Sequence, residues 1–309
     1  MKKVLLLLMF IPIISYSQIS TIKVADEKDI KTIEYDSLKN FQGENYSNYI
    51  GQDLFLRPIN EKLRKYGYDN FKLDPNGSSY SDSNIYKKNK KAESNYEELQ
   101  SKVFTVIDVM KDPSRATNRT MAYLKLKFKD NEDVVFFKYS KVYSHSFPFT
   151  VMGYFEKSKE IFVGNEVLIR DFKNASAMNI TDINNGEVLN IGTDKYYKCL
   201  DVTLDGKSFK LVLLLETEAK QKFTFNLSTR FLNIPRILLK SEAESYKVKF
   251  GNSYWEAILN EEVIVGFTEE MTLLSWGEPK SINRSSSGDQ WVYSSQYLYF
   301  ENGIMQSFN

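Results

Sequence analysis

The chain has 309 residues, with 41 basic and 40 acidic side chains, one histidine and one cysteine. This near-neutral balance argues against broad electrostatic capture of nucleic acid or of an anionic membrane, and a single cysteine excludes an intramolecular disulfide. The 21 phenylalanines and 20 tyrosines favour β-sheets, in which aromatic side chains pack across strands, and they also suit surfaces that bind carbohydrate or peptide.

The N-terminus has the pattern of a secretory signal peptide. Lys2 and Lys3 precede an apolar run over residues 4–14, and serines stand at the −3 and −1 positions of a cut after Ser17. The run is shorter than the roughly 20 residues that cross a bilayer, and no cysteine follows it that could carry a lipid. We therefore expect residues 1–17 to be removed. The mature protein is then soluble in the periplasm or outside the cell, with no lipoprotein anchor and no transmembrane segment.

The rest of the chain is long enough for about two domains. A polar N-terminal segment covers residues 18–48, and residues 74–83 form a loop by composition. From Lys102 onward the pattern is mostly that of strands, which we predict at 103–109, 121–128 and 134–139.

An internal repeat indicates two copies of one β-rich module. Residues 49–57 align without gaps with residues 162–170, and residues 104–109 align with residues 197–202, with the chemical type kept at almost every position. The offsets differ because a loop-rich insertion lies in the first copy, between the two aligned stretches. We predict modules at 49–160 and 161–245, each a small antiparallel barrel of SH3-like or similar type, within an α+β chain that is mostly antiparallel β.

Two residue types recur at matching places in the repeat. Gly51 and Gly164 are expected to supply a backbone conformation that other residues resist, at a turn or bulge. Asp108 and Asp201 could be ligand groups, but an aspartate that caps a turn or a backbone amide is the commoner role.

The clearest sequence signals for secondary structure lie at the C-terminus. Thr268 is a good helix N-cap, Gly277 suits the helix C-terminus, and Pro279 prevents its continuation. A polar loop is predicted from Ser281 to Asp289, and two strands rich in Trp and Tyr follow it. The Asn302–Gly303 pair predicts a tight hairpin turn, because it accepts positive φ at low cost.

This layout resembles the BamE/SmpA-like fold, in which a helical segment packs on a small antiparallel sheet. The resemblance covers about residues 246–309. It rests on the eleven-residue spacing of Gly266 and Gly277, on Pro279, on Trp291 with Tyr293, and on the turn at Gly303. In amino-acid sequence the segment is similar to the C-terminal module of uncharacterised exported proteins of the Bacteroidetes type. The resemblance implies a structural or protein-contacting module with no chemistry of its own.

The residue types that carry most catalysis are scarce. A zinc site needs several His, Cys or carboxylate ligands, and His145 and Cys199 are single and far apart in sequence. His145 is expected to be a plain loop residue and Cys199 a small buried apolar one. No phosphate-binding loop is present, so we predict no catalytic residues of these types, no metal site and no cofactor.

These observations favour an exported, non-enzymatic binding or scaffolding protein of the cell envelope. Its partner would be a protein or an envelope polymer rather than nucleic acid. One alternative is an envelope hydrolase that uses dispersed Asp and Glu carboxylates, and another is a proteinaceous inhibitor. The candidate binding residues are aromatic: Trp255, Trp276, Trp291 and Tyr293. Exposed tryptophans would favour the inhibitor, whereas their burial would give them a core role.

Overall fold

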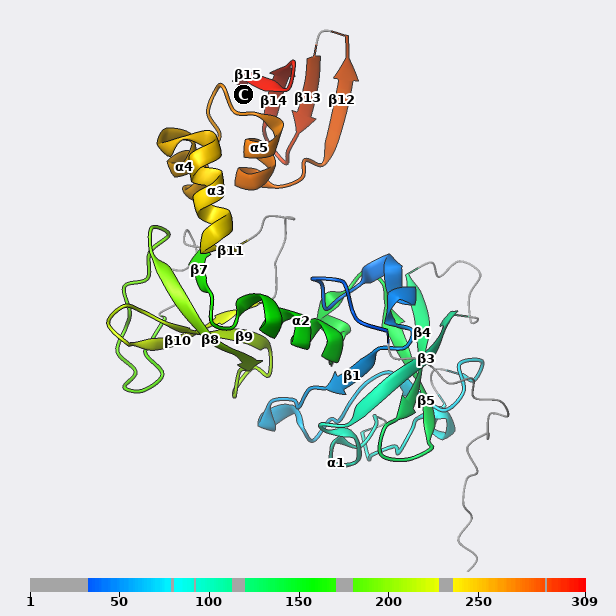
Figure 1. The fold of residues 1–309 in the computed structure, drawn as a ribbon. Helices are drawn as coiled ribbons and strands as arrows, with labels where there is room; N and C mark the ends of the chain where they lie inside the picture. Colours follow the sequence, from blue (N-terminus) through cyan, green and yellow to red (C-terminus); the bar gives the residue numbers. More distant parts are fainter. Residues whose placement is uncertain are drawn as a thin grey trace, which may run out of the picture.

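The computed structural model describes residues 33–78, 81–91, 93–112, 120–170, 180–227, 236–286 and 288–309. The predicted signal peptide and the first part of the polar N-terminal segment lie outside these residues. Three antiparallel sheets follow one another along the chain, with few helices between them (Figure 1). The expected α+β class, dominated by antiparallel strands, is confirmed.

The first sheet has six strands in the order β2-β5-β4-β3-β1-β6. Its strands are β1 (Asp53–Leu56), β2 (Phe71–Lys72), β3 (Val103–Lys111), β4 (Met121–Phe128), β5 (Val134–Ser140) and β6 (Phe149–Val151). Short helical turns accompany them: η1 (Gly43–Tyr49), η2 (Glu61–Leu63), η3 (Asp82–Asn84), α1 (Tyr96–Leu99) and η4 (Ser144–Ser146). The three strands predicted from alternating hydrophobicity are therefore confirmed as β3, β4 and β5.

The second sheet has five strands in the order β10-β9-β8-β7-β11. They are β7 (Glu166–Ile169), β8 (Tyr196–Leu204), β9 (Leu211–Glu216), β10 (Lys222–Asn226) and β11 (Ile237–Leu239). In the first sheet β1, β3, β4 and β5 form a meander, and β6 returns to pair with β1. In the second sheet β7 to β10 form the meander, and β11 returns to pair with β7. The two strand orders are therefore the same except for the additional strand β2. The segment between the first two meander strands is longer in the first copy, where it contains β2, and this insertion accounts for the unequal sequence offsets.

Each of the first two sheets passes directly into a helix of 11 residues. Helix α2 (Met152–Phe162) follows β6, and helix α3 (Lys240–Phe250) follows β11. Helix α2 contacts β1 and β6, and α3 makes the matching contacts with β7 and β11. The repeated unit is therefore a sheet plus the helix that follows it, and the predicted boundaries near 160 and 246 fall inside these two helices.

A glycine turn connects a helical segment to the first strand of each sheet. Gly51 and Gly164 have φ of +80° and +82°, and the preceding Ile50 and Val163 have φ and ψ close to −60° and +130°. These angles define a type II turn, whose third position requires positive φ and therefore favours glycine.

The hydrogen bonds of this turn are repeated too. The Gly51 N–H donates to the Val106 carbonyl at 2.8 Å, and the Gly164 N–H donates to the Cys199 carbonyl at 2.9 Å. In sequence Val106 and Cys199 occupy equivalent positions of the repeat. The turn therefore fixes the first strand against the second in both copies.

The repeated aspartates lie two residues after Val106 and Cys199 on the same strands. The pairing of β3 with β4 shifts between Val106 and Asp108, and that of β8 with β9 shifts between Cys199 and Asp201. The Asp108 carboxylate accepts from the Val109 N–H at 2.7 Å, and the Asp201 carboxylate accepts from the Val202 N–H at 2.8 Å. Both aspartates cap a backbone amide at a β-bulge, as expected.

The C-terminal unit packs helices against one face of a four-stranded meander. The helices are α4 (Asn252–Leu259) and α5 (Glu269–Trp276), and the strands are β12 (Ser281–Ser285), β13 (Gly288–Val292), β14 (Tyr297–Glu301) and β15 (Ile304–Phe308). Thr268 caps α5 by accepting from the Met271 N–H at 3.2 Å. Asn302 and Gly303 both have positive φ in the β14–β15 turn. The predicted polar loop from Ser281 to Asp289 is wrong, because these residues form β12 and the start of β13.

A buried cation joins the second sheet to the C-terminal unit. Arg170 follows β7, is 2% exposed, and donates through Nη2 to the Ile258 carbonyl at 3.0 Å. Burial lowers the pKa of its guanidinium to about 10. A positive charge is favourable there, because the last carbonyls of α4 carry the negative end of the helix dipole. Leu168 and Leu238 extend the same contact into the C-terminal core.

Replacement of Gly164 by alanine tests the turn. The added Cβ meets no atom within 4 Å, so the cost is backbone strain alone, about 1–2 kcal/mol. We expect urea unfolding to show that loss for Gly164→Ala and no comparable loss for Gly206→Ala, which also has open space but no positive φ. Equal effects of the two substitutions would contradict the turn argument.

Replacement of Arg170 by alanine tests the contact with the C-terminal unit. Loss of a charged hydrogen bond of this kind costs roughly 1.5–3 kcal/mol, and hydrogen exchange should become faster in α4 in particular. Arg284→Ala is the control, because that side chain is 78% exposed and its loss should change stability by less than about 0.5 kcal/mol. Unchanged exchange in α4 would contradict the proposed role of Arg170.

Candidate binding site

The four tryptophan and tyrosine candidates are structural in the C-terminal unit. Trp255 is 4% exposed and Trp291 is 3% exposed. Trp276 is half-buried and donates through Nε1 to the Glu261 carbonyl at 2.8 Å. The Tyr293 hydroxyl donates to the Gly277 carbonyl at 2.7 Å, and its ring meets Trp276 edge to face at 5.3 Å. Trp255 and Trp291 are therefore core residues, and Trp276 and Tyr293 are each held in place by a hydrogen bond to a backbone carbonyl.

The remaining sequence candidates also have local structural roles. Gly266 turns the chain with φ of +94°, and its N–H donates to the Met305 carbonyl at 2.9 Å. Gly277 ends α5 with φ of +76°, and Pro279 follows in the connection to β12. The structure thus brings Trp276, Gly277 and Tyr293 together, but it does not gather all the predicted site residues into one site.

Two potential nucleophile or base residues lie apart from each other. Cys199 is fully buried in β8, and burial raises the pKa of its thiol to about 11. A thiol of that kind is inert. His145 is exposed in η4, beside Tyr143. Within the described residues, no three His, Cys, Asp or Glu side chains come close enough together to hold a metal ion.

The outer face of the C-terminal sheet carries the exposed aromatic side chains that the sequence analysis missed. We define the outer face as the face opposite the helices, where strand pairing places Ser281, Asn283, Ser285, Gln290, Val292, Tyr297, Tyr299, Glu301, Ile304 and Ser307. Tyr297 is 41% exposed and Tyr299 is 36% exposed, whereas Leu298 and Phe300 between and beside them are buried. The alternating pattern of β14 thus separates a core face from an open aromatic face.

A chain of hydrogen bonds crosses the outer face from strand to strand. The Asn283 amide donates to the Gln290 side-chain oxygen at 2.8 Å, and the Gln290 amide donates to the Tyr299 hydroxyl at 3.2 Å. These three residues lie directly opposite one another in β12, β13 and β14. These hydrogen bonds orient the two amides and the phenol relative to one another.

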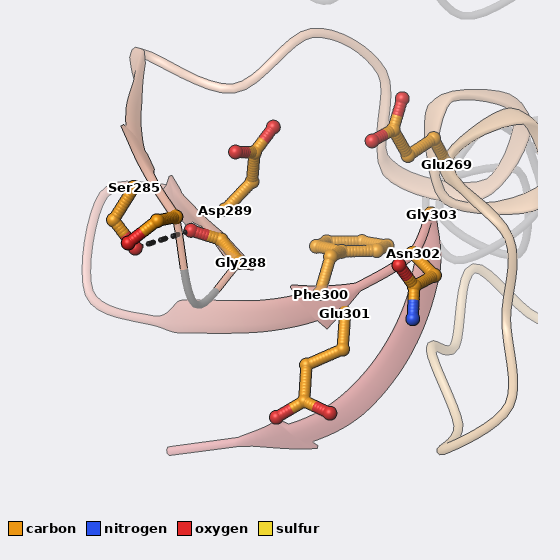
Figure 2. A pocket seen from close by; sticks show the side chains of 9 residues that line it. Glu269, Ser285, Gly288, Asp289, Phe300, Glu301, Asn302 and Gly303 are labelled. Atoms are coloured by element: carbon orange, nitrogen blue, oxygen red, sulfur yellow. Dashed lines mark hydrogen bonds between the residues drawn. The ribbon is translucent and has the colours of Figure 1, made fainter.

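On the helix side of the same sheet lies a hollow of about 370 Å³. Its lining includes Glu269, Asp289, Phe300 and Asn302. Figure 2 shows Glu269 and Asp289 on one side of the sheet and Glu301 on the other. The hollow is open to solvent, so its carboxylates are not enclosed.

A second carboxyl pair lies at the edge of the first sheet. Tyr68 and Ser94 exchange both backbone hydrogen bonds, at 2.9 and 3.0 Å, and this bridge brings the neighbouring Asp69 and Glu93 together. Desolvation, followed by the hydrogen bond to Asp69, raises the pKa of Glu93 to about 7. Burial lowers the pKa of the neighbouring Lys72 ammonium.

Comparison of the chain with protein-family models, with curated proteins and with solved structures gives no match. Across the described ranges, the helices are all too short or too polar to cross a membrane.

The raised pKa of Glu93 predicts a pH-dependent stability. Between about pH 4.5 and pH 7 the folded chain holds a proton that the unfolded chain has released, so stability falls as the pH rises through this range. Glu93→Gln cannot ionise, and we expect its melting temperature relative to the unmodified chain to rise between pH 5 and pH 8. Glu97→Gln, in the exposed turn of α1, is the control. A pH-independent difference for Glu93→Gln would contradict the raised pKa of Glu93.

Proposed function

We propose that this chain is an exported, non-enzymatic binding or scaffolding protein of the cell envelope, and that the outer face of its C-terminal sheet is the contact surface. The observation that carries the proposal is the open row of Tyr297 and Tyr299 beside the hydrogen-bonded Asn283 and Gln290. Export is supported by the pattern of residues 1–17.

The arrangement of the three units supports a scaffolding role. Two copies of a sheet-plus-helix unit precede the C-terminal unit, and the buried Arg170 contact ties that unit to the second copy. The helices α4 and α5 cover one face of the last sheet, which leaves the other face open. This helix-on-sheet layout also supports the proposed likeness to the BamE/SmpA-like fold.

The inhibitor alternative loses its expected anchors, since Trp255 and Trp291 are buried. An inhibitor would have to use Tyr297 and Tyr299 instead. The hydrolase alternative has one specific observation in its favour, because Glu269 and Asp289 line the same hollow. Both alternatives assign the functional residues to the C-terminal unit, so variants of this unit distinguish the inhibitor from the hydrolase.

Retention on isolated cell-envelope material tests the proposal. We expect the mature chain to sediment with the envelope fraction, and the double variant Tyr297→Ala/Tyr299→Ala to lose at least nine-tenths of that retention, because both aromatic contacts are removed. Tyr66→Ala is the matched control: Tyr66 is 46% exposed but lies in the first module.

Three outcomes would contradict the proposal. The chain could fail to sediment at all, or the double variant could sediment as well as the unmodified chain. Soluble fragments released from the envelope material by the unmodified chain, but not by Glu269→Gln/Asp289→Asn, would establish the hydrolase instead.

A further inference from the structure

The chemistry of the outer face narrows the class of its ligand. Among the outward positions of β12 to β15 the only charged side chain is Glu301, and no lysine or arginine is present. Nucleic acid and anionic polymers need cations for their phosphates or carboxylates. A polyanion is therefore excluded as the main ligand, and an uncharged one fits.

The aromatic residues add a geometric constraint. Tyr297 and Tyr299 are two residues apart on one strand, so their Cα atoms lie about 6.5–7 Å apart and their side chains leave the same face of the sheet. Their ring faces carry negative partial charge, which attracts the weakly positive C–H groups on the flat faces of pyranose rings. Two such rings in a row suit a ligand that repeats a flat C–H surface along its length.

The chain of amides supplies the polar half of the recognition. Asn283, Gln290 and the Tyr299 hydroxyl are already oriented by their mutual hydrogen bonds, so binding does not have to order them. Their remaining donors and acceptors match hydroxyl groups, each of which both donates and accepts. A protein partner would have to desolvate this polar row in the middle of its interface, where apolar anchors are the usual content.

We propose that the outer face binds a neutral polysaccharide of β-linked pyranose units, with Tyr297 and Tyr299 stacking on sugar rings and Asn283 and Gln290 binding hydroxyls. The inference rests on the proposed function, of which it names the ligand class. Val292 and Ile304 flank the aromatic row, one beside Tyr297 and the other beside Glu301. They widen the apolar contact without joining into a continuous apolar patch.

Titration of the mature chain with cellohexaose and with chitohexaose, followed by calorimetry, tests this inference. We expect binding of at least one of the two oligosaccharides, and at least a tenfold loss of affinity, about 1.4 kcal/mol, in Tyr297→Ala/Tyr299→Ala. Tyr299→Phe keeps the ring and loses only the hydroxyl, so its loss should be smaller, and Tyr66→Ala should bind as the unmodified chain does. Circular dichroism of each variant establishes that it folds.

Two results would overturn the glycan assignment. One is no binding of either oligosaccharide at millimolar concentration by the folded unmodified chain. The other is binding that the folded double variant retains. If the chain ignores both sugars yet loses its retention on envelope material in the double variant, the outer face binds something other than a neutral glycan: the ligand assignment then fails and the proposed function stands.

Discussion

The structure depends on a type II turn that only glycine forms without strain. The Gly51 N–H donates to β3 at 2.8 Å, and the Gly164 N–H donates to β8 at 2.9 Å. These hydrogen bonds fix β1 against β3 and β7 against β8. The aspartate-capped bulge follows at the same distance along the second strand. Because turn and bulge recur together, the two sheets share one strand order despite the additional strand β2 in the first. Each sheet then runs into an 11-residue helix, and the second of these helices leads into the C-terminal unit.

The position of the C-terminal unit follows from the second sheet. Leu168 and Leu238 contribute to its core, and Arg170 reaches the carbonyl end of α4 from the end of β7. A buried guanidinium is costly unless hydrogen bonds and nearby negative charge compensate it, so this contact requires a defined geometry. With α4 and α5 on one face of the last sheet, the opposite face and its two tyrosines are left exposed.

Local signals in the sequence predicted much of this fold. Thr268, Asn302 and the repeated glycines each have a backbone requirement that one residue type meets best, so their roles were readable without contacts. The strand β12 was missed because an edge strand of Ser, Asn and Arg has no hydrophobic alternation. Without β12, the hydrogen bond from Asn283 to Gln290 could not be predicted, and neither could the row of polar side chains that continues to Tyr299. The pairing of Asp69 with Glu93 could not be predicted from the sequence either, because the backbone bridge between Tyr68 and Ser94 creates it.

The sequence favoured the tryptophans as binding residues, whereas the exposed aromatic row of the C-terminal sheet consists of tyrosines. Tryptophan is large enough to fill the core of a unit of this size, and Trp255 and Trp291 do so, whereas the tyrosines of β14 face outward because alternate residues of a strand point to opposite faces. The most direct measurement of the central claim is the footprint of the envelope ligand on the full mature chain, by amide hydrogen exchange with and without envelope polysaccharide. The account predicts slower exchange in β13 and β14 and at Asn283, with the two repeated modules unchanged. Protection confined to the repeated modules, or to the hollow beside Glu269, would contradict it.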